Sequence, residues 1–186
     1  PDNGIIQGCS FLTEDHPLEK VFTPEEFNDE EKMIGKLMFD FVEGSVLPQM
    51  DDLESQKEGA MSATLKEAGK LGLLSVDVPE EFGGFAQSKA VSMLMAEKLA
   101  KSGSFQVAYG ANTGIGTLPI VYFGTKEQKQ KYLPGLATGE TLGAYALTEA
   151  GSGSDAMAAK SKAVLSEDGT HYVLNGEKMY ITNAGF

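Results

Sequence analysis

The sequence contains no arginine, because all 15 basic residues among its 186 are lysines. A bidentate guanidinium clamp on a phosphate or carboxylate is therefore excluded within this chain. An anion would have to be held by backbone N–H groups, hydroxyls or lysines. Cysteine is almost absent as well. Cys9 is the only one, so no internal disulfide can form, and a reducing compartment is expected.

Histidine is nearly as scarce. His16 and His171 are the only two, and they are far apart in the sequence. With a single cysteine, they cannot form the usual zinc ligand pattern, so no metal site is expected. A Ser-His-Asp triad would need one of them. His171 lies in an alternating, strand-like pattern and His16 in a polar stretch, so neither is predicted to be a catalytic base.

Acidic residues outnumber basic ones, and the formal net charge of −12 is unevenly distributed along the chain. Residues 1–58 hold 15 acidic residues against four lysines, whereas residues 59–186 are nearly balanced. No basic stripe exists to neutralise phosphates, so nucleic acid is not an expected partner. The N-terminus lacks the basic start and apolar core of a signal peptide. Residues 102–125 carry no charge, but their glycines and Pro119 make them too broken for a membrane span. A buried helix pair is expected there instead.

Apolar residues at helical spacing dominate the chain up to residue 140. Thr23, Pro24 and Glu26 form a capping-box helix start, and Pro48 interrupts the pattern that follows. The spacing predicts three further helices, over residues 57–71, 88–102 and 125–136. A short extended piece is expected over residues 73–79.

The period changes after Gly139. A buried strand is predicted over 141–147, and alternation predicts strands over 161–166, 170–174 and 178–182. Asp168-Gly169 is a turn signal, and Asn175-Gly176 is a strong hairpin signal. The expected fold class is α+β, with an all-α domain over 1–140 and the start of an antiparallel β-barrel or sandwich domain over 141–186. Because so few strands make a poor independent domain, we expect this chain to be part of a longer protein.

One loop stands out, in the run AYALTEAGSGSDA over residues 144–156. Gly151, Gly153 and Ala156 fit a dinucleotide-binding fingerprint. That loop, however, must open a helix, and only one turn of helix could fit before alternation begins at Ser161. We therefore reject the dinucleotide interpretation. No Gly-Lys-[Ser/Thr] occurs either, which excludes a P-loop. A plain connection remains possible, with Asp155 bonding its own backbone.

Two observations favour a ligand-facing role for this loop. It has more hydroxyls than a turn requires, and Thr148 needs a partner at the mouth of a buried strand. The run Tyr180-Ile181-Thr182 adds a second feature, since period 2 places Tyr180 and Thr182 on one face and Met179 and Ile181 on the core side. That face is either an ordinary half-exposed strand or a platform for a flat heteroaromatic ligand.

The pair AYALTEAGSGSDA and LNGEKMYITNAG, in this order, resembles the acyl-CoA dehydrogenase family. The segments VPEEFGGFAQS and GTLPIVYFGTKEQKQKYLPGLATGE are similar to others of the family, so the resemblance covers the chain from about Phe22. Within the family, the chain is most similar to very-long-chain and related bacterial members. The resemblance implies an N-terminal α domain, a middle β domain and FAD as cofactor. It also implies oxidation of acyl-CoA to trans-2-enoyl-CoA, by α-proton abstraction and β-hydride transfer to flavin N5.

The resemblance also implies site residues. Leu147 through its backbone and Thr148 through its hydroxyl would contact the flavin edge, Thr182 would lie near N5, and Ser154 would bond the substrate. The full set implied for FAD is Tyr145, Leu147, Thr148, Gly153, Ser154, Tyr180, Ile181 and Thr182. Two residues depart from the family pattern: Tyr180 stands where many members have Trp, and Ala150 where Pro is common.

No catalytic residue is expected in this chain. The family's base is a Glu of a C-terminal helical domain, and none of Glu149, Asp155 or Glu177 matches it. The base is expected downstream of Phe186, so the piece alone should be inactive. Ala111 is expected to contact the substrate. The small residues of its stretch, among them Gly110, Gly114 and Gly116, indicate either a deep acyl pocket or close helix packing.

The resemblance further implies acyl-CoA as substrate, an electron-transfer flavoprotein as acceptor and a homo-oligomeric assembly. The expected location is the cytoplasm, or the mitochondrial matrix in a eukaryotic source. Two alternatives remain open: an acyl-CoA oxidase or related flavin enzyme on the same scaffold, and a helical binding module without cofactor.

Overall fold

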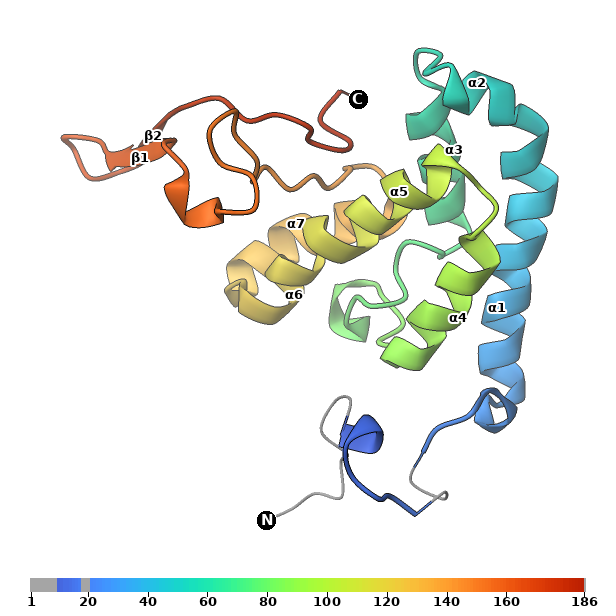
Figure 1. Ribbon diagram of the computed structural model, residues 1–186. Coiled ribbons are helices and arrows are strands. Elements are labelled where there is room, and N and C mark those ends of the chain that lie inside the picture. The colour runs from blue at the N-terminus through green and yellow to red at the C-terminus, as the bar shows by residue number, and fades with distance from the viewer. Residues whose placement is uncertain (1–9, 18–20, 186) are drawn as a thin grey trace.

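The computed structural model describes residues 10–17 and 21–185, which form a mostly helical body and one small sheet (Figure 1). The α-helices are α1 (Asp29–Phe41), α2 (Met50–Glu54), α3 (Ala60–Lys70), α4 (Lys89–Leu99), α5 (Ser104–Gly110), α6 (Leu118–Phe123) and α7 (Lys126–Thr138). The strands are β1 (Lys162–Leu165) and β2 (Tyr172–Asn175). Short 3-10 turns cover Ser10–Leu12, Pro24–Glu26, Leu47–Gln49, Glu80–Phe82 and Ala156–Ala158. The α+β fold class is confirmed.

The first long helix starts later than the sequence predicted. The capping box of Thr23 closes only a single 3-10 turn. Asn28 then forms a second capping box, in which its Oδ1 accepts from the N–H of Glu31 at 2.9 Å and its own N–H donates to the Glu31 carboxylate at 2.9 Å. Since this second cap satisfies the free N–H groups of the longer helix, α1 begins at Asp29.

Helical structure continues through Pro48, although an interruption was expected there. After α1 the chain widens into a π-helical segment, Val42–Val46, then tightens into the 3-10 turn that contains Pro48 and continues as α2. Proline has no N–H to donate and its ring crowds the preceding turn. The change of helical pitch on either side of Pro48 has this local cause.

The helical core lies where α1, α3, α4 and α5 meet, and α1 and α4 lie side by side (Figure 1). Phe105 is fully buried there, and Tyr109 donates its hydroxyl to the carbonyl of Leu73 at 2.6 Å. The uncharged stretch forms the expected pair of helices, α5 and α6, joined by the π-helical segment Ala111–Gly116. The expected burial holds for α5, whereas no residue of α6 is buried. Residues 73–79 form turns instead of an extended piece, although Leu73, Leu74, Val76 and Val78 are buried.

Only one of the expected strand pairings forms. β1 and β2 are antiparallel, with Lys162 opposite Asn175 and Leu165 opposite Tyr172, and the Asp168-Gly169 turn lies between them. The predictions of strands over 141–147 and 178–182, and of a hairpin at Asn175-Gly176, are wrong for the described residues. A strand needs a partner strand for its backbone groups. In 141–147 both backbone groups of Gly143 bond to asparagine side chains instead, and the described backbone bond between the two segments is the one from the N–H of Met179 to the carbonyl of Thr148.

Candidate functional site

The two segments that carry the sequence motifs lie next to each other, although about 30 residues separate them in sequence. We name them the first segment (residues 144–149) and the second segment (residues 178–183). The N–H of Met179 donates to the carbonyl of Thr148 at 2.9 Å. The Nζ of Lys178 donates to the carbonyl of Leu147, also at 2.9 Å. The folded chain therefore brings together Leu147, Thr148 and the neighbours of Tyr180.

Large apolar side chains on these segments are exposed. Tyr145 is 45% exposed, Leu147 41% and Tyr180 85%. The hydroxyls of Thr148 and Thr182 make no hydrogen bond to any residue that the structure describes. Apolar and aromatic groups gathered at a surface, with free hydroxyls beside them, are typical of a binding site.

Tyr180 has a left-handed backbone conformation, with φ at 57°. This conformation is unfavourable for a bulky residue, and such strain tends to gather at functional sites. It also explains why the expected strand is absent at this position. The alternation of exposure nevertheless agrees with the prediction, because Met179 and Ile181 are half-buried while Tyr180 and Thr182 are exposed.

Glu149 is the most strongly bonded carboxylate near these segments. Its side chain is 9% exposed. It accepts from the N–H of Lys160 at 2.6 Å, from the N–H of Ser161 at 3.0 Å and from Lys178 Nζ at 2.8 Å. The Lys178 bond, followed by the bonds from Ser161 and Lys160, holds the pKa of Glu149 well below its usual range. A carboxylate so stabilised in its charged form is a poor proton acceptor, which agrees with its exclusion as the base.

The Gly-Ser loop is a tight turn at its start and open at its end. Glu149 and Ser152 exchange two backbone hydrogen bonds, at 3.0 and 3.1 Å. The buried Ser152 hydroxyl donates to the carbonyl of Asp155 at 2.8 Å. Gly153 and Ser154 are exposed. Only the 3-10 turn at residues 156–158 follows, which confirms that no helix is present to bind a dinucleotide pyrophosphate.

Two buried asparagines hold Gly143, the residue that directly precedes the first segment, and neither asparagine has a local signal in the sequence. Asn112 Oδ1 accepts from the N–H of Gly143 at 2.6 Å. Asn183 Nδ2 donates to the carbonyls of Gly143, at 3.1 Å, and Ala108, at 2.9 Å. Both backbone groups of Gly143 are thus bonded to side chains, and the second segment is tied to α5 through the same contact.

A groove of about 440 Å³ runs between α4 and α5 and reaches the π-helical segment. Gly110 and Gly114 line it, and a Cβ added at either would meet no atom within 4 Å. A Cβ at Gly116, in contrast, would lie 2.9 Å from the backbone of Gly143. The small residues therefore differ in role: Gly110 and Gly114 leave open space in the groove, and Gly116 allows the backbone at Gly143 to approach closely. Ala111 is buried and is not among the residues that line the groove.

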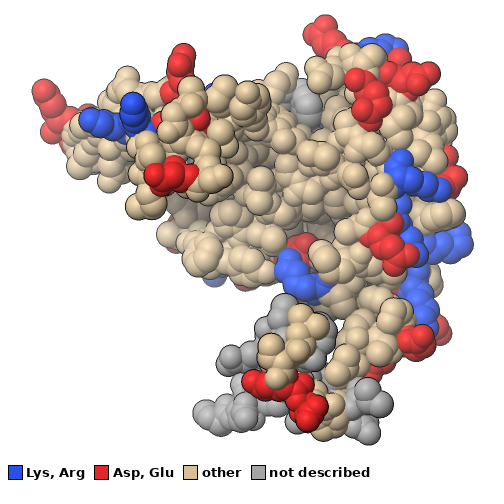
Figure 2. All heavy atoms as spheres, in the orientation of Figure 1, with Lys and Arg blue, Asp and Glu red and all other residues tan. Residues whose placement is uncertain are grey.

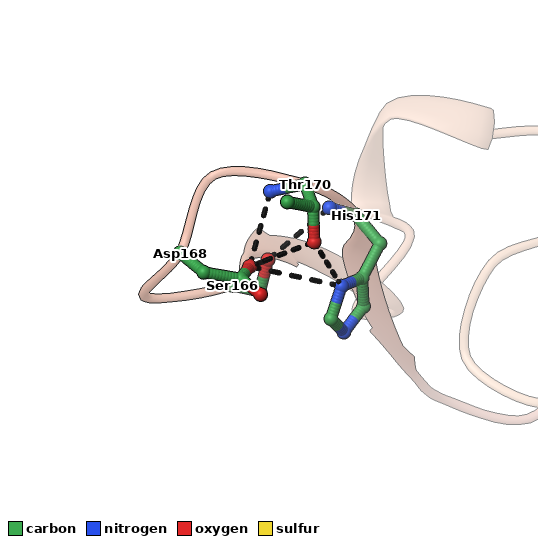
Figure 3. Close-up of polar contacts among 4 residues, drawn as sticks. All are labelled: Ser166, Asp168, Thr170 and His171. Atoms are coloured by element: carbon green, nitrogen blue, oxygen red, sulfur yellow. Dashed lines mark hydrogen bonds and ion pairs between the residues drawn. The ribbon is translucent and has the colours of Figure 1, made fainter.

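Figure 3 shows the cluster around His171, where Ser, His and Asp come close without forming a triad. Asp168 accepts from the hydroxyls of Ser166, at 2.6 Å, and Thr170, at 2.8 Å. The Ser166 hydroxyl donates to Asp168, and the imidazole Nδ1 of His171 contacts Thr170 Oγ1 at 2.9 Å. These bonds stabilise the exposed β1–β2 turn. The hydrogen bond from the Ser166 hydroxyl, followed by those from Thr170, lowers the pKa of Asp168 below its usual value.

The charged side chains of the described surface are unevenly placed. Charged side chains gather along α1 and α2 and at the hairpin, while the middle of this face, over α5, is largely uncharged (Figure 2). Within residues 10–17 and 21–185 there is no cluster of three or more residues able to hold a metal ion. In the same ranges, no helix has the length and apolar character needed to cross a membrane.

These features define an α+β protein with an accessible apolar and hydroxyl-bearing face on two joined segments. Two family models match the chain: the acyl-CoA dehydrogenase N-terminal domain over residues 28–140, and the middle domain over residues 144–186. The chain belongs to the acyl-CoA dehydrogenase family.

Individual relatives agree. A probable acyl-CoA dehydrogenase of Bacillus subtilis (strain 168) is 56% identical over 98% of this chain and 31% of its own length. The mitochondrial very long-chain specific acyl-CoA dehydrogenase of Bos taurus is 38% identical over 98% of this chain and 27% of its own. The crystal structure of an acyl-CoA dehydrogenase complexed with FAD from Bacillus anthracis is 55% identical over 97% of this chain and 31% of its own, with a TM-score of 0.93. The chain thus spans about a third of these relatives.

Proposed function

We propose that this chain is the N-terminal part of an FAD-dependent acyl-CoA dehydrogenase, which oxidises acyl-CoA to trans-2-enoyl-CoA. Residues 1–140 would supply the helical domain and residues 141–186 the first part of the middle β domain. The observation that carries the proposal is the bond between Met179 and Thr148, which joins the two motif segments. The family membership and the FAD of the Bacillus anthracis relative support it.

The described residues fit a flavin. A flavin ring is flat, with a polar edge, and here the exposed Tyr145, Leu147 and Tyr180 offer apolar contact. The carbonyl of Leu147 is occupied by Lys178, so its N–H is the backbone group left for a ligand. The free hydroxyls of Thr148 and Thr182 are suitable for the polar edge. Ile181 would pack beside the ring. Gly153 and Ser154 would lie toward the CoA portion, with Ser154 donating a hydrogen bond.

The chemistry divides between the cofactor and the protein. FAD, when bound, supplies the acceptor for the β-hydride of the substrate. The residues of this chain bind and orient: the apolar face excludes water, and the two threonine hydroxyls would tune the polar edge. The α-proton must pass to a base, and Glu149 is already bonded to Lys178 and two N–H groups. The base is therefore expected in another part of the protein.

The groove beside Gly110 and Gly114 is the proposed acyl site. Its volume of about 440 Å³ and the open space at both glycines favour a long acyl chain. Ala111, which is buried next to Gly110, is part of this proposal as a substrate contact. An electron-transfer flavoprotein as acceptor and a homo-oligomeric assembly belong to the same proposal, on the basis of the family.

The test is to purify the complete gene product, record its flavin absorbance and measure acyl-CoA-dependent dye reduction. We expect a yellow protein that turns over acyl-CoA, while residues 1–186 alone show no activity. A colourless complete protein would favour the cofactor-free binding module. Rapid use of oxygen as acceptor would favour an oxidase.

A second experiment tests the proposed role of the Thr182 hydroxyl. Thr182→Val removes one hydroxyl from the proposed flavin edge and is expected to lower kcat about two- to tenfold, since a hydrogen bond between neutral groups is worth about 0.5–1.5 kcal/mol. Thr170→Val removes a hydroxyl from the β1–β2 turn and is the matched control. Equal activity of the two variants would contradict the assignment of Thr182.

A further inference from the structure

The Glu149 carboxylate connects three parts of the chain that are distant in sequence. One oxygen accepts from the N–H of Lys160, and the other accepts from the N–H of Ser161 and from Lys178 Nζ. The same ammonium group donates to the carbonyl of Leu147 at 2.9 Å. The first segment, the start of the hairpin and the second segment therefore share one hydrogen-bonded network.

Stability alone does not explain such a pair. The Glu149 side chain is 9% exposed and that of Lys178 27%. Removing two charges from water costs about as much as their attraction returns, so an apolar pair of similar size would stabilise the fold as well or better. Buried polar pairs are instead suited to fixing one geometry among several. Here two backbone N–H groups fix the carboxylate, and the carboxylate fixes the ammonium group.

The geometry selected by this network concerns the face described above. Lys178 and Met179 bond to consecutive carbonyls, those of Leu147 and Thr148. These contacts set the register of the two segments, and with it the position of Tyr180 relative to Thr148. Lys178 also occupies the Leu147 carbonyl, so it removes an acceptor from the backbone that a ligand would meet.

We propose that Glu149 and Lys178 are positioning residues of the flavin site, whose ion pair sets the register of the first and second segments and leaves donors, instead of a free carbonyl, for the cofactor. This inference rests on the proposed function. Both residues would act through the neighbours that they hold in place, namely Leu147, Thr148 and Tyr180.

The experiment uses the complete flavoprotein and compares three variants. Glu149→Gln keeps the size of the side chain but places an amide where backbone donors need an acceptor. Lys178→Met removes the charge and both hydrogen bonds, and Lys178→Arg restores a cation with several donors. Glu177→Gln and Lys162→Met are charge-matched controls, since neither side chain bonds to any residue in the described ranges.

Four quantities are measured: the FAD dissociation constant, the visible flavin spectrum, kcat with KM, and the thermal unfolding temperature. Partners that orient metal ligands are worth about 10- to 100-fold in affinity or activity. By that measure Glu149→Gln and Lys178→Met should weaken FAD binding or lower kcat at least about tenfold and shift the flavin bands, with KM changing much less. Lys178→Arg should recover most of the loss, and both controls should match the wild type.

A purely structural pair would behave differently. If Glu149→Gln lowers the unfolding temperature while flavin affinity, spectrum and kcat stay at control values, the inference is overturned. Should Lys178→Met fail to fold, the isosteric Glu149→Gln decides on the same readouts. A wild-type protein that binds no flavin would instead contradict the proposed function itself, and the two failures are thereby told apart.

Discussion

Gly116 and Gly114 are two residues apart in one helical segment, yet an added methyl group should have opposite effects at the two positions. At Gly116 the new Cβ would lie 2.8 Å from the carbonyl oxygen of Ala111 and 2.9 Å from the backbone of Gly143. At Gly114 it would meet nothing within 4 Å. The two substitutions therefore separate a backbone contact from an open groove within one short stretch.

The magnitudes follow from this geometry. Replacing Gly by Ala at a compatible position gains about 0.4–1 kcal/mol, mainly by restricting the unfolded chain. Overpacking against atoms that cannot rotate away costs about 1–3 kcal/mol. At Gly116 the neighbours are backbone atoms, and displacing Gly143 would also weaken its 2.6 Å bond to Asn112, worth about 1 kcal/mol. We expect Gly116→Ala to destabilise by about 1–3 kcal/mol and Gly114→Ala to be neutral or slightly stabilising.

The assay is urea unfolding of the chain, followed by circular dichroism, for the wild type and both variants. Gly114→Ala should also reduce activity toward the longest acyl chains in the complete protein, because the methyl group projects into the groove. A Gly116→Ala variant as stable as Gly114→Ala would refute the close approach of Gly116 to Gly143.

Three further predictions use the same unfolding assay. Gly69→Ala should destabilise by about 3 kcal/mol, at the upper end of the overpacking range, because a Cβ there would lie 2.2 Å from the carbonyl oxygen of Thr138, which ends α7. Gly44→Ala, with open space around it, should not destabilise. Tyr109→Phe should lower the free energy of unfolding by about 1–3 kcal/mol, because it leaves the buried Leu73 carbonyl unpaired. Burial also raises the pKa of Tyr109, so the wild type should lose stability above about pH 10, the pKa of an unfolded tyrosine. The Tyr109→Phe variant should lack this loss at high pH. Because the pKa of Glu149 is lowered in the folded state, the contribution of Glu149 to stability should be present above about pH 4.3, its unfolded pKa, and should fade at lower pH. If Glu149→Gln lost stability with falling pH in the same way as the wild type, this prediction would be contradicted.

Local signals in the sequence located most of the helices. Ser88 and Thr125, at which two of the predicted helix ranges begin, cap α4 and α7 through their own hydroxyls. The signal at Thr23 was equally good and its capping box forms, but Asn28 supplies another within one turn. The sequence pattern alone could not decide between two adjacent caps, because each is complete by itself.

The β part was predicted less well, since alternation describes only what a strand does with its side chains. Whether a strand forms depends on partners for its backbone. Gly143 lies inside the predicted strand 141–147, and both its backbone groups bond to asparagine side chains. Tyr180 lies inside the predicted strand 178–182 and has a left-handed conformation. Neither fact has a local signal.

In the candidate site, too, some residues could be predicted and others could not. The resemblance named the residues of the exposed face, whereas the groups that hold this face in place were missed. Glu149 meets Lys178 across 29 positions, and Asn183 meets Ala108 across 75. Such contacts depend on the folded path of the chain, so no spacing rule within the sequence could indicate them.

The π-helical segment Ala111–Gly116 connects the groove to the motif segments. Gly114 faces the groove, Asn112 bonds to Gly143, and Gly116 packs on the same glycine. An α-helix turns by about 100° per residue and the wider π-helix by less, so residues two apart lie on roughly opposite sides in either, and one segment can serve both. Its glycines are therefore not interchangeable: those on the groove side set the space for a ligand, and the one on the other side sets how closely the first segment approaches the helices.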